Sequence, residues 1–133
     1  MKTGQLSIDT ATRKVVDLSE AVRAFCAREG DGLLNVFAPH STAGLAIMEL
    51  GSRSDADLEA VLDTLLPRDD RYLHAHGTSG HGADHLLPAF LAPSITIPVT
   101  GGRLMLGTWQ SVVLVDLNVD NPTRQVQLSL LTG

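Results

Sequence analysis

Aromatic residues, cysteine and runs of basic residues are all scarce in this chain. Its 133 residues include one tryptophan, one tyrosine, three phenylalanines and a single cysteine. Cys26 cannot form an internal disulfide, and its apolar neighbours favour a buried, unreactive thiol over a nucleophile. Lysine and arginine are scattered and the net charge is −5, so no run of basic residues is present that could bind along a phosphate backbone. This composition argues against a general nucleic-acid-binding protein.

Long apolar stretches are also missing. No apolar run reaches the ~20 residues of a membrane span, and the first residues lack an apolar signal segment. We therefore expect a soluble cytoplasmic protein with no membrane partner. The remaining composition, 44% hydrophobic and 19% charged, is sufficient for a packed core. The length predicts a single domain over residues 1–133.

The hydrophobic pattern predicts a chain rich in β-strands. Val112 to Leu117 form an apolar run interrupted only by Asp116, typical of a strand covered on both faces. Thr100-Gly101-Gly102 is a tight hairpin signal, and short turns of this kind favour antiparallel pairing. Strands are expected near residues 5–8, 14–18, 33–38, 45–48, 95–99, 103–106, 112–117 and 126–130. The predicted fold is α+β, mainly an antiparallel, jelly-roll-like β-sandwich with two or three flanking helices.

Two helices are expected near residues 20–29 and 54–66. Ser19 and Ser54 are suitable N-cap residues for them. In the second helix Leu58, Leu62 and Leu65 share one face with Val61, following the spacing of an amphipathic helix. Residues 68–82 are polar and are expected to form a loop. Residues 83–91 can form a short helix only if it begins late, because Pro88 lacks a backbone donor.

Five histidines are the most informative residues. His40 follows Pro39 at the end of an expected strand, and His74, His76, His81 and His85 lie within twelve residues. Imidazole is the commonest metal ligand and titrates near neutral pH, so this grouping favours a metal site or an acid–base site. His81 and His85 are four residues apart and would share a helix face, although Gly82 weakens a helix there.

Less specific readings of these histidines remain open. The second group could be a polar loop without a ligand, and His40 could simply cap its strand through hydrogen bonds. If a metal is bound, three imidazoles would give a site with an open position, and Asp84 could orient one of them.

A few other residues could bind a substrate. Arg124 could bind a phosphate or carboxylate through two parallel hydrogen bonds, or pair with Asp116 in a structural salt bridge. Trp109 could pack in the core or form the wall of a ligand pocket, with Thr108 and Gln110 as flanking hydrogen-bonding groups. No glycine-rich phosphate loop followed by lysine is present, so a phosphate grip must come from hydroxyls, Arg124 or a bound cation.

Two polar strings carry a resemblance to a known family. They are Phe37-Ala38-Pro39-His40-Ser41-Thr42-Ala43 and Leu106-Gly107-Thr108-Trp109-Gln110, with Glu49, Leu66-Pro67, Tyr72, His74, His85, Ile97-Pro98-Val99, Gly102 and Leu104 between or beside them. In this order they resemble the YjbQ family, described as secondary thiamine-phosphate synthase, over nearly the whole chain. Two departures are Leu50–Asp55, which replaces a more acidic string in the family, and Asp84, where alanine is usual.

The resemblance implies a fold, an assembly and a reaction. The fold is a compact antiparallel β-sandwich with helices, and the assembly is a homotrimer. The reaction is a transfer that joins a pyrimidine pyrophosphate to a thiazole phosphate, with His40, Glu49 and His85 as expected catalytic residues. A metal-dependent hydrolase and a non-catalytic metal- or ligand-binding module are the alternatives.

The expected ligands follow from the same residues. We expect His40, His74 and His85 to bind a divalent ion, zinc or magnesium, with His76 and His81 outside the site. A small phosphorylated substrate would be held by hydroxyl, amide, indole and guanidinium groups. These groups belong to Ser41, Thr42, Thr108, Trp109, Gln110 and Arg124.

Overall fold

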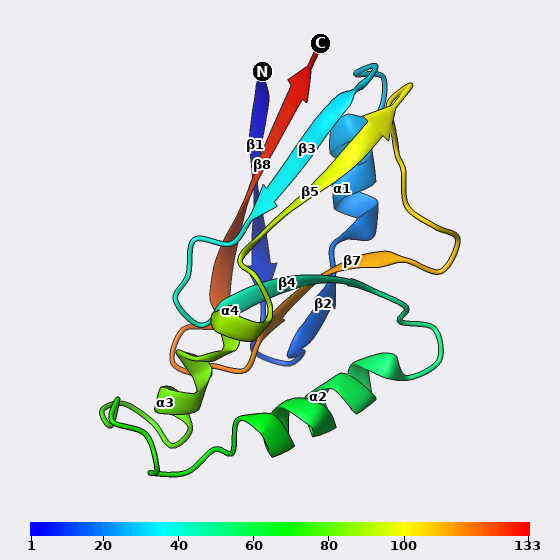
Figure 1. Cartoon of the computed structure of the whole chain (residues 1–133). Helices are drawn as coiled ribbons and strands as arrows, with labels where there is room; N and C mark the ends of the chain where they lie inside the picture. The colour runs from blue at the N-terminus through cyan, green and yellow to red at the C-terminus, as the bar shows by residue number, and fades with distance from the viewer.

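Antiparallel strands dominate the computed structural model, which describes residues 1–133 (Figure 1). Five strands form one sheet in the order β1-β8-β3-β5-β6, and three form a second sheet in the order β2-β7-β4. The strands are β1 (Lys2–Asp9), β2 (Val15–Asp17), β3 (Gly32–Phe37), β4 (Ala43–Met48), β5 (Ser94–Thr100), β6 (Arg103–Leu104), β7 (Ser111–Asp116) and β8 (Thr123–Thr132). All pairings are antiparallel, which confirms the predicted fold class.

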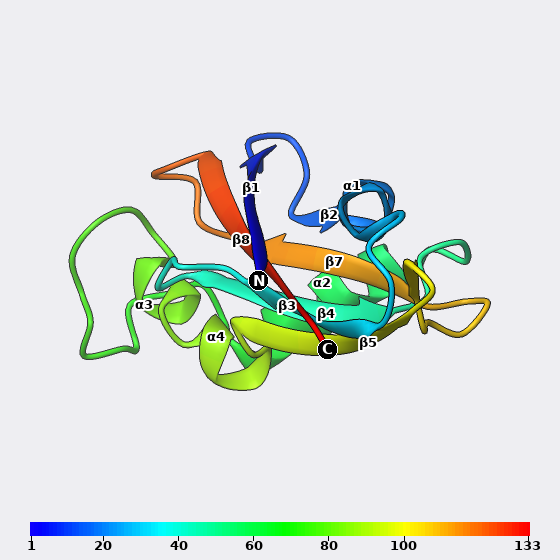
Figure 2. The same ribbon diagram turned by 90° about the horizontal axis from the view of Figure 1, so that it is seen from above.

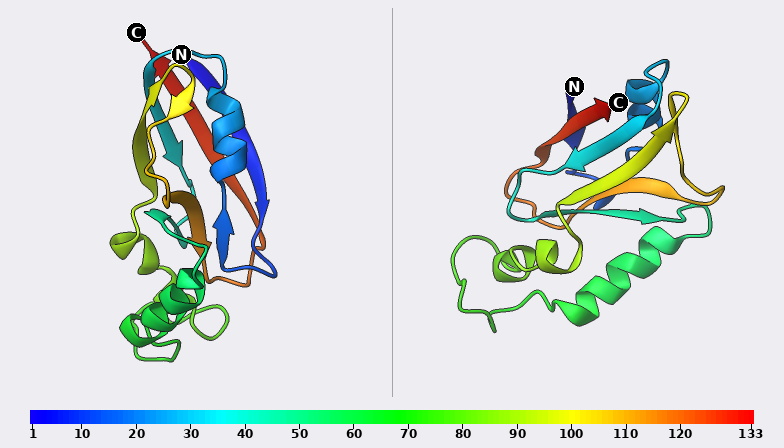
Figure 3. Two further views of the ribbon diagram at one scale, coloured as in Figure 1. Left: turned by 90° about the vertical axis from the view of Figure 1, so that its right-hand side faces the viewer. Right: turned by 45° about the horizontal axis from the view of Figure 1, so that its top comes forward.

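Four helices flank the sheets. They are α1 (Ser19–Cys26), α2 (Ser54–Leu65), α3 (His81–Asp84) and α4 (Leu87–Phe90). Figure 3 shows α2 and the two short helices on the side of the three-stranded sheet opposite the chain termini. None of the helices is both long and apolar enough to cross a membrane.

Strand β7 is the centre of the molecule, and its sequence explains why. Val112 and Leu114 point into the core between the two sheets, whereas Val113 and Val115 point into a second core beneath α2 and α4. All four side chains are fully buried. Since successive side chains of a strand face opposite sides, an unbroken apolar run is what a strand covered on both faces requires. The prediction for this segment is confirmed.

The β5–β6 hairpin turns where the sequence predicts. Gly101 and Gly102 have φ values of 58° and 75°, which residues with a Cβ rarely adopt. Pro88 lies in the first turn of α4, where its missing N–H breaks no helical hydrogen bond. The expected segment 83–91 is therefore two separate single turns, α3 and α4.

The two helix caps were predicted wrongly. The residue before each helix, Leu18 or Arg53, is the cap, and neither makes a side-chain capping bond. The hydroxyl of Ser19 instead accepts a hydrogen bond from the backbone N–H of Val112, 2.9 Å away, and so ties α1 to β7. Ser54 is simply the first residue of α2.

Burial differs from the expected pattern on α2. Leu62 is buried there, but Val61 and Leu65 are 59% and 48% exposed. The helix therefore rests on the sheet along a narrower stripe than its sequence pattern suggests. In α1, Cys26 is fully buried and free, and burial raises the pKa of its thiol, as expected for an unreactive cysteine.

Candidate metal centre

Four histidines converge above α3. His81 begins this helix and His85 caps its C-terminal end, and the N–H of His85 donates to the carbonyl of His81. The ring of His74 stacks on that of His85 with 4.2 Å between centroids and lies 4.8 Å from that of His81. One ligand nitrogen from each of His74, His81 and His85 lies within 4.8 Å of the others. His76 borders the group, 4.4 Å from the ring of His74.

Gly82 allows this convergence. A Cβ at this position would lie 2.6 Å from the carbonyl oxygen of His74 and 2.7 Å from the side chain of Tyr72. The glycine that weakens the helix by its propensity therefore lets the loop carrying His74 cross directly over α3. This contact joins α3 to a different segment of the chain. The residue pattern of the helix alone could therefore not reveal it.

The pKa values of His74 and His85 are lowered, which favours the neutral form that binds metal. Burial lowers the pKa of His85, and the neighbouring imidazoles of His74 and His81 lower it further. The pKa of His74 is lowered by desolvation and by His76 and His81. Each cation that formed here would repel the next, so protonation is disfavoured and the nitrogen lone pairs remain available.

His81 lies against a carboxylate. Its Nδ1 lies 3.1 Å from a carboxylate oxygen of Asp120, whose pKa is lowered by hydrogen bonds from Thr78, His81 and Asn118. Because a carboxylate accepts hydrogen bonds, Asp120 favours the neutral tautomer with the proton on Nδ1 and the lone pair on Nε2. This Nε2 is buried and has no hydrogen-bond partner. A buried ring nitrogen without a partner, beside two imidazoles of lowered pKa, is what a metal site requires of its ligand.

His40 occupies a separate position at the same end of the molecule. Its Nε2 accepts a hydrogen bond from the backbone N–H of Gln125 at 2.9 Å. Burial lowers its pKa, and the adjacent Arg124 cation lowers it further. The structure thus groups His74 and His85 with His81, and within one chain His40 is not a member of the trio. His81, expected to lie outside the site, is the third member.

Arg124 and Asp116 form a buried ion pair beside His40. The Arg124 Nε donates to Asp116 Oδ2 at 2.6 Å, and its Nη2 donates to the Thr42 hydroxyl at 3.1 Å. The Thr42 hydroxyl in turn donates to the Asp116 carboxylate at 3.3 Å. Of the two readings of Arg124 from the sequence, the structure shows the salt bridge. Ser41, next to Thr42, is exposed.

Asn118 connects this pair to the histidine trio. Its backbone N–H donates to Asp116, and its side-chain amide donates to Asp84 at 3.0 Å. The same amide lies 3.5 Å from Asp120, the partner of His81. Asp84 is fully buried and also pairs with Arg68. The expectation that Asp84 orients an imidazole by a hydrogen bond is therefore wrong, and Asp120 has that position.

A known protein family matches almost the whole chain. The family described as "UPF0047 protein YjbQ-like" matches residues 4–133. The chain belongs to the YjbQ family. It is 65% identical over the full length of both chains to "UPF0047 protein Rv2556c" of Mycobacterium tuberculosis. It is 35% identical to a UPF0047 protein of Methanothermobacter thermautotrophicus, with 96% of this chain and 90% of the relative covered.

Solved structures agree with the fold of this YjbQ chain. The crystal structure of hypothetical protein APE1520 from Aeropyrum pernix superposes with a TM-score of 0.88 at 33% identity, and all of both chains is covered.

The two strings that carry the YjbQ resemblance lie at opposite ends of one strand pair. Ala43 pairs with Asp116 at one end of β4 and β7, and Met48 pairs with Ser111 at the other. Six residues of strand separate these ends by ~20 Å. Figure 2 shows α3 and α4 at one end and the loop between β6 and β7 at the other. Within one chain, the Gly107–Gln110 string is therefore remote from the histidines.

The residues at that remote end are exposed. Glu49 lies just beyond β4 and accepts a hydrogen bond from the Ser52 hydroxyl at 3.3 Å. Trp109 is 73% exposed, so the reading that places it in the core is wrong. The Gln110 side chain closes its own loop by accepting from the N–H of Gly107. Thr108 lines a cavity described below.

Sequence reasoning missed two members of the site. His81 could have been found from its four-residue spacing to His85, but Gly82 argued against the helix. No sequence pattern indicated Asp120, because the turn between β7 and β8 brings it to His81 only in the folded chain.

Proposed function

We propose that His74, His81 and His85 bind one zinc ion, and that the ion serves a reaction on a small phosphorylated substrate. The buried, unpartnered Nε2 of His81 carries this proposal. It lies within 4.8 Å of the ligand nitrogens of both other histidines, while Asp120 holds the proton on its opposite nitrogen. Three protein ligands leave a fourth tetrahedral position for water or substrate, as in catalytic zinc sites.

The donor set supports zinc over magnesium. Imidazole nitrogen suits zinc, whereas magnesium prefers oxygen ligands in an octahedron and keeps several waters. No carboxylate belongs to the trio, and two acidic groups beside it, Asp84 and Asp120, are already engaged by Arg68, Asn118 and His81.

The bound ion would supply a Lewis acid and a water of lowered pKa. The chain's own residues provide the surroundings. Asp120 holds the His81 proton at Nδ1, and Asn118 keeps Asp120 in place by accepting its backbone N–H at 2.9 Å. Burial and the adjacent Arg124 cation lower the pKa of His40, and its Nε2 accepts the backbone N–H of Gln125. The charge of the buried Arg124 is neutralised by Asp116, so Arg124 has a structural role. The proposed zinc ion would then bind the phosphate of the substrate.

Two reactions fit this proposal. Membership of the YjbQ family supports a thiamine-phosphate-synthase-type transfer, in which a cation would neutralise the leaving pyrophosphate. The all-imidazole donor set supports the second candidate, hydrolysis of a phosphoester by a metal-dependent hydrolase. The two differ in what they release and in how many substrates they need.

One set of assays separates these reactions. Purified protein is analysed for metals and then tested, before and after chelator treatment, for pyrophosphate release from the two thiamine precursors and for phosphate release from a phosphomonoester. Transfer requires both precursors together, whereas hydrolysis requires one ester alone. His85→Ala should lose the metal and either activity, and His76→Ala is the matched control that should keep both. Metal bound without turnover of either substrate would leave a binding module.

We also propose that the chain acts in the cytoplasm as a homotrimer, as the family resemblance implies. The outward-facing positions along β3, β5 and β8 support a contact between copies, because none carries a charge. They are Leu33, Asn35, Phe37, Ser94, Thr96, Pro98, Thr100, Thr123, Gln125, Gln127, Ser129 and Leu131. No helix covers this face (Figure 1). Sedimentation at micromolar concentration should give three times the chain mass of 14.1 kDa, and a monomer would refute this assembly.

A further inference from the structure

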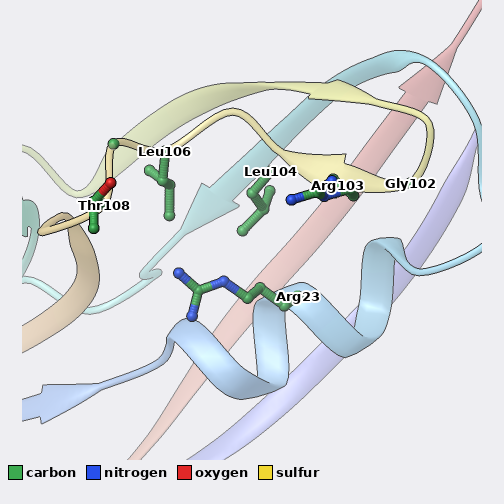
Figure 4. Close-up of a pocket in the computed structure, with 7 residues that line it drawn as sticks. Arg23, Gly102, Arg103, Leu104, Leu106 and Thr108 are labelled. Carbon is green, nitrogen blue, oxygen red and sulfur yellow. The ribbon is translucent and has the colours of Figure 1, made fainter.

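A cavity of about 410 Å³ lies between α1 and the segment around β6, at the end of the molecule remote from the histidines. Arg23 projects from α1, Arg103 and Leu104 belong to β6, and Leu106 and Thr108 follow in the loop toward β7. Figure 4 shows the guanidinium of Arg23 facing the side chains of Leu104 and Leu106 across this space. The volume is within the range of small-molecule pockets.

The charges around this cavity are of one sign. Two guanidinium groups line it, and no acidic residue does. Neither arginine belongs to any of the chain's five ion pairs. The chain as a whole has a net charge of −5, yet these two unpaired cations share one cavity. Like charges repel each other, so a bound anion would stabilise this arrangement. Guanidinium binds phosphate through paired hydrogen bonds, and the Thr108 hydroxyl adds a third donor.

We propose that this cavity binds a phosphorylated small molecule. Its phosphate would lie between Arg23 and Arg103, and its apolar part against Leu104 and Leu106. Within one chain the cavity is distinct from the proposed zinc site, because the β4–β7 strand pair separates the two. It also gives a role to Thr108, which belongs to the Gly107–Gln110 string that the histidine cluster leaves unused. The proposal does not depend on zinc or on the reaction proposed above.

Trp109 makes the binding measurable. It is the chain's only tryptophan, it follows Thr108 directly, and it is solvent-exposed. The full chain, treated with chelator to remove any metal, is titrated with phenyl phosphate while tryptophan fluorescence is recorded. Isothermal calorimetry provides a second readout that does not depend on Trp109. Inorganic phosphate and benzyl alcohol are titrated in parallel, because each carries only one half of the proposed recognition.

Variants locate the site. Arg23→Gln and Arg103→Gln should each weaken phenyl phosphate binding about tenfold or more, the usual loss for one charge-assisted contact. Arg13→Gln is the matched control, because Arg13 is equally exposed and lies in a cleft with Asp55 and Glu59. It should change affinity by no more than about twofold, as should His85→Ala. Circular dichroism confirms that each variant is folded.

The expected result is saturable binding of phenyl phosphate that is tighter than that of either half-probe. Absence of saturation in both readouts would overturn the proposal. So would equal losses in Arg13→Gln and the pocket variants, which would indicate general attraction of anions to surface arginines. Equal affinity for inorganic phosphate would overturn the apolar half of the recognition. Loss of binding in His85→Ala would move the phosphate to the histidine cluster.

Discussion

Asp120→Asn should weaken zinc binding although Asp120 is not a ligand. Its carboxylate fixes the proton of His81 on Nδ1 across 3.1 Å and so keeps Nε2 available. An asparagine at this position has no charge and can turn its NH₂ group toward Nδ1, which favours the wrong tautomer. Loss of such an orienting partner typically costs 10–100-fold in metal affinity, or about 1.4–2.7 kcal/mol. Because the Asp120 side chain is 35% exposed, the fold itself should be little affected.

The assay is competition for zinc against a chelating indicator near neutral pH. Asp57→Asn removes an exposed carboxylate that makes no ion pair, and it should bind zinc like the unmodified chain. His81→Ala should lose more affinity than Asp120→Asn, because it removes the ligand itself. If Asp120→Asn binds zinc as tightly as Asp57→Asn, the assignment of His81 as an oriented ligand is refuted.

Three further predictions concern stability. Trp109→Ala should change the free energy of unfolding by no more than about 0.5 kcal/mol, whereas Leu114→Ala should lower it by about 2–5 kcal/mol. Chemical denaturation measures both values. A large loss for Trp109→Ala would contradict the exposed position of Trp109. Asp116→Ala should cost about 3–5 kcal/mol, because it leaves the buried Arg124 cation without its partner, and a near-neutral result would show that water reaches it. Burial lowers the pKa of His40 in the folded chain, so the unfolded chain binds a proton at this residue more tightly. The free energy of unfolding should therefore fall as the pH drops below about 6.5. His40→Gln should reduce this fall, and an unchanged pH profile would exclude His40 as its source.

Predictions from the sequence succeeded where one residue pattern admits one structure. The apolar run of β7 demands cover on both faces, and the paired glycines at 101 and 102 demand a tight turn. Pro88 was compatible with a helix only in its first turn, where it is found. The cap predicted at Ser19 failed because Ser19 has a tertiary partner in Val112, and this long-range hydrogen bond overrides a local preference.

The site was only partly predictable for the same reason. The clustering of histidines is visible in the sequence, and His74 and His85 were correctly placed near each other. The choice between His40 and His81 depends on how the loop before α3 crosses Gly82, which is a matter of tertiary contact. The sequence leaves Trp109 open between the core and a pocket wall, and its 73% exposure excludes the core, although its size favours burial on average.

The most direct test of the zinc site is a crystal structure with anomalous diffraction recorded at the zinc absorption edge. We predict one anomalous peak per chain, ~2.0–2.1 Å from Nε2 of His81 and from one ring nitrogen each of His74 and His85. Asp120 should remain within hydrogen-bond distance of His81 Nδ1. A zinc-supplemented crystal with no peak between these rings, or with a peak that His40 binds in place of His81, would contradict the account.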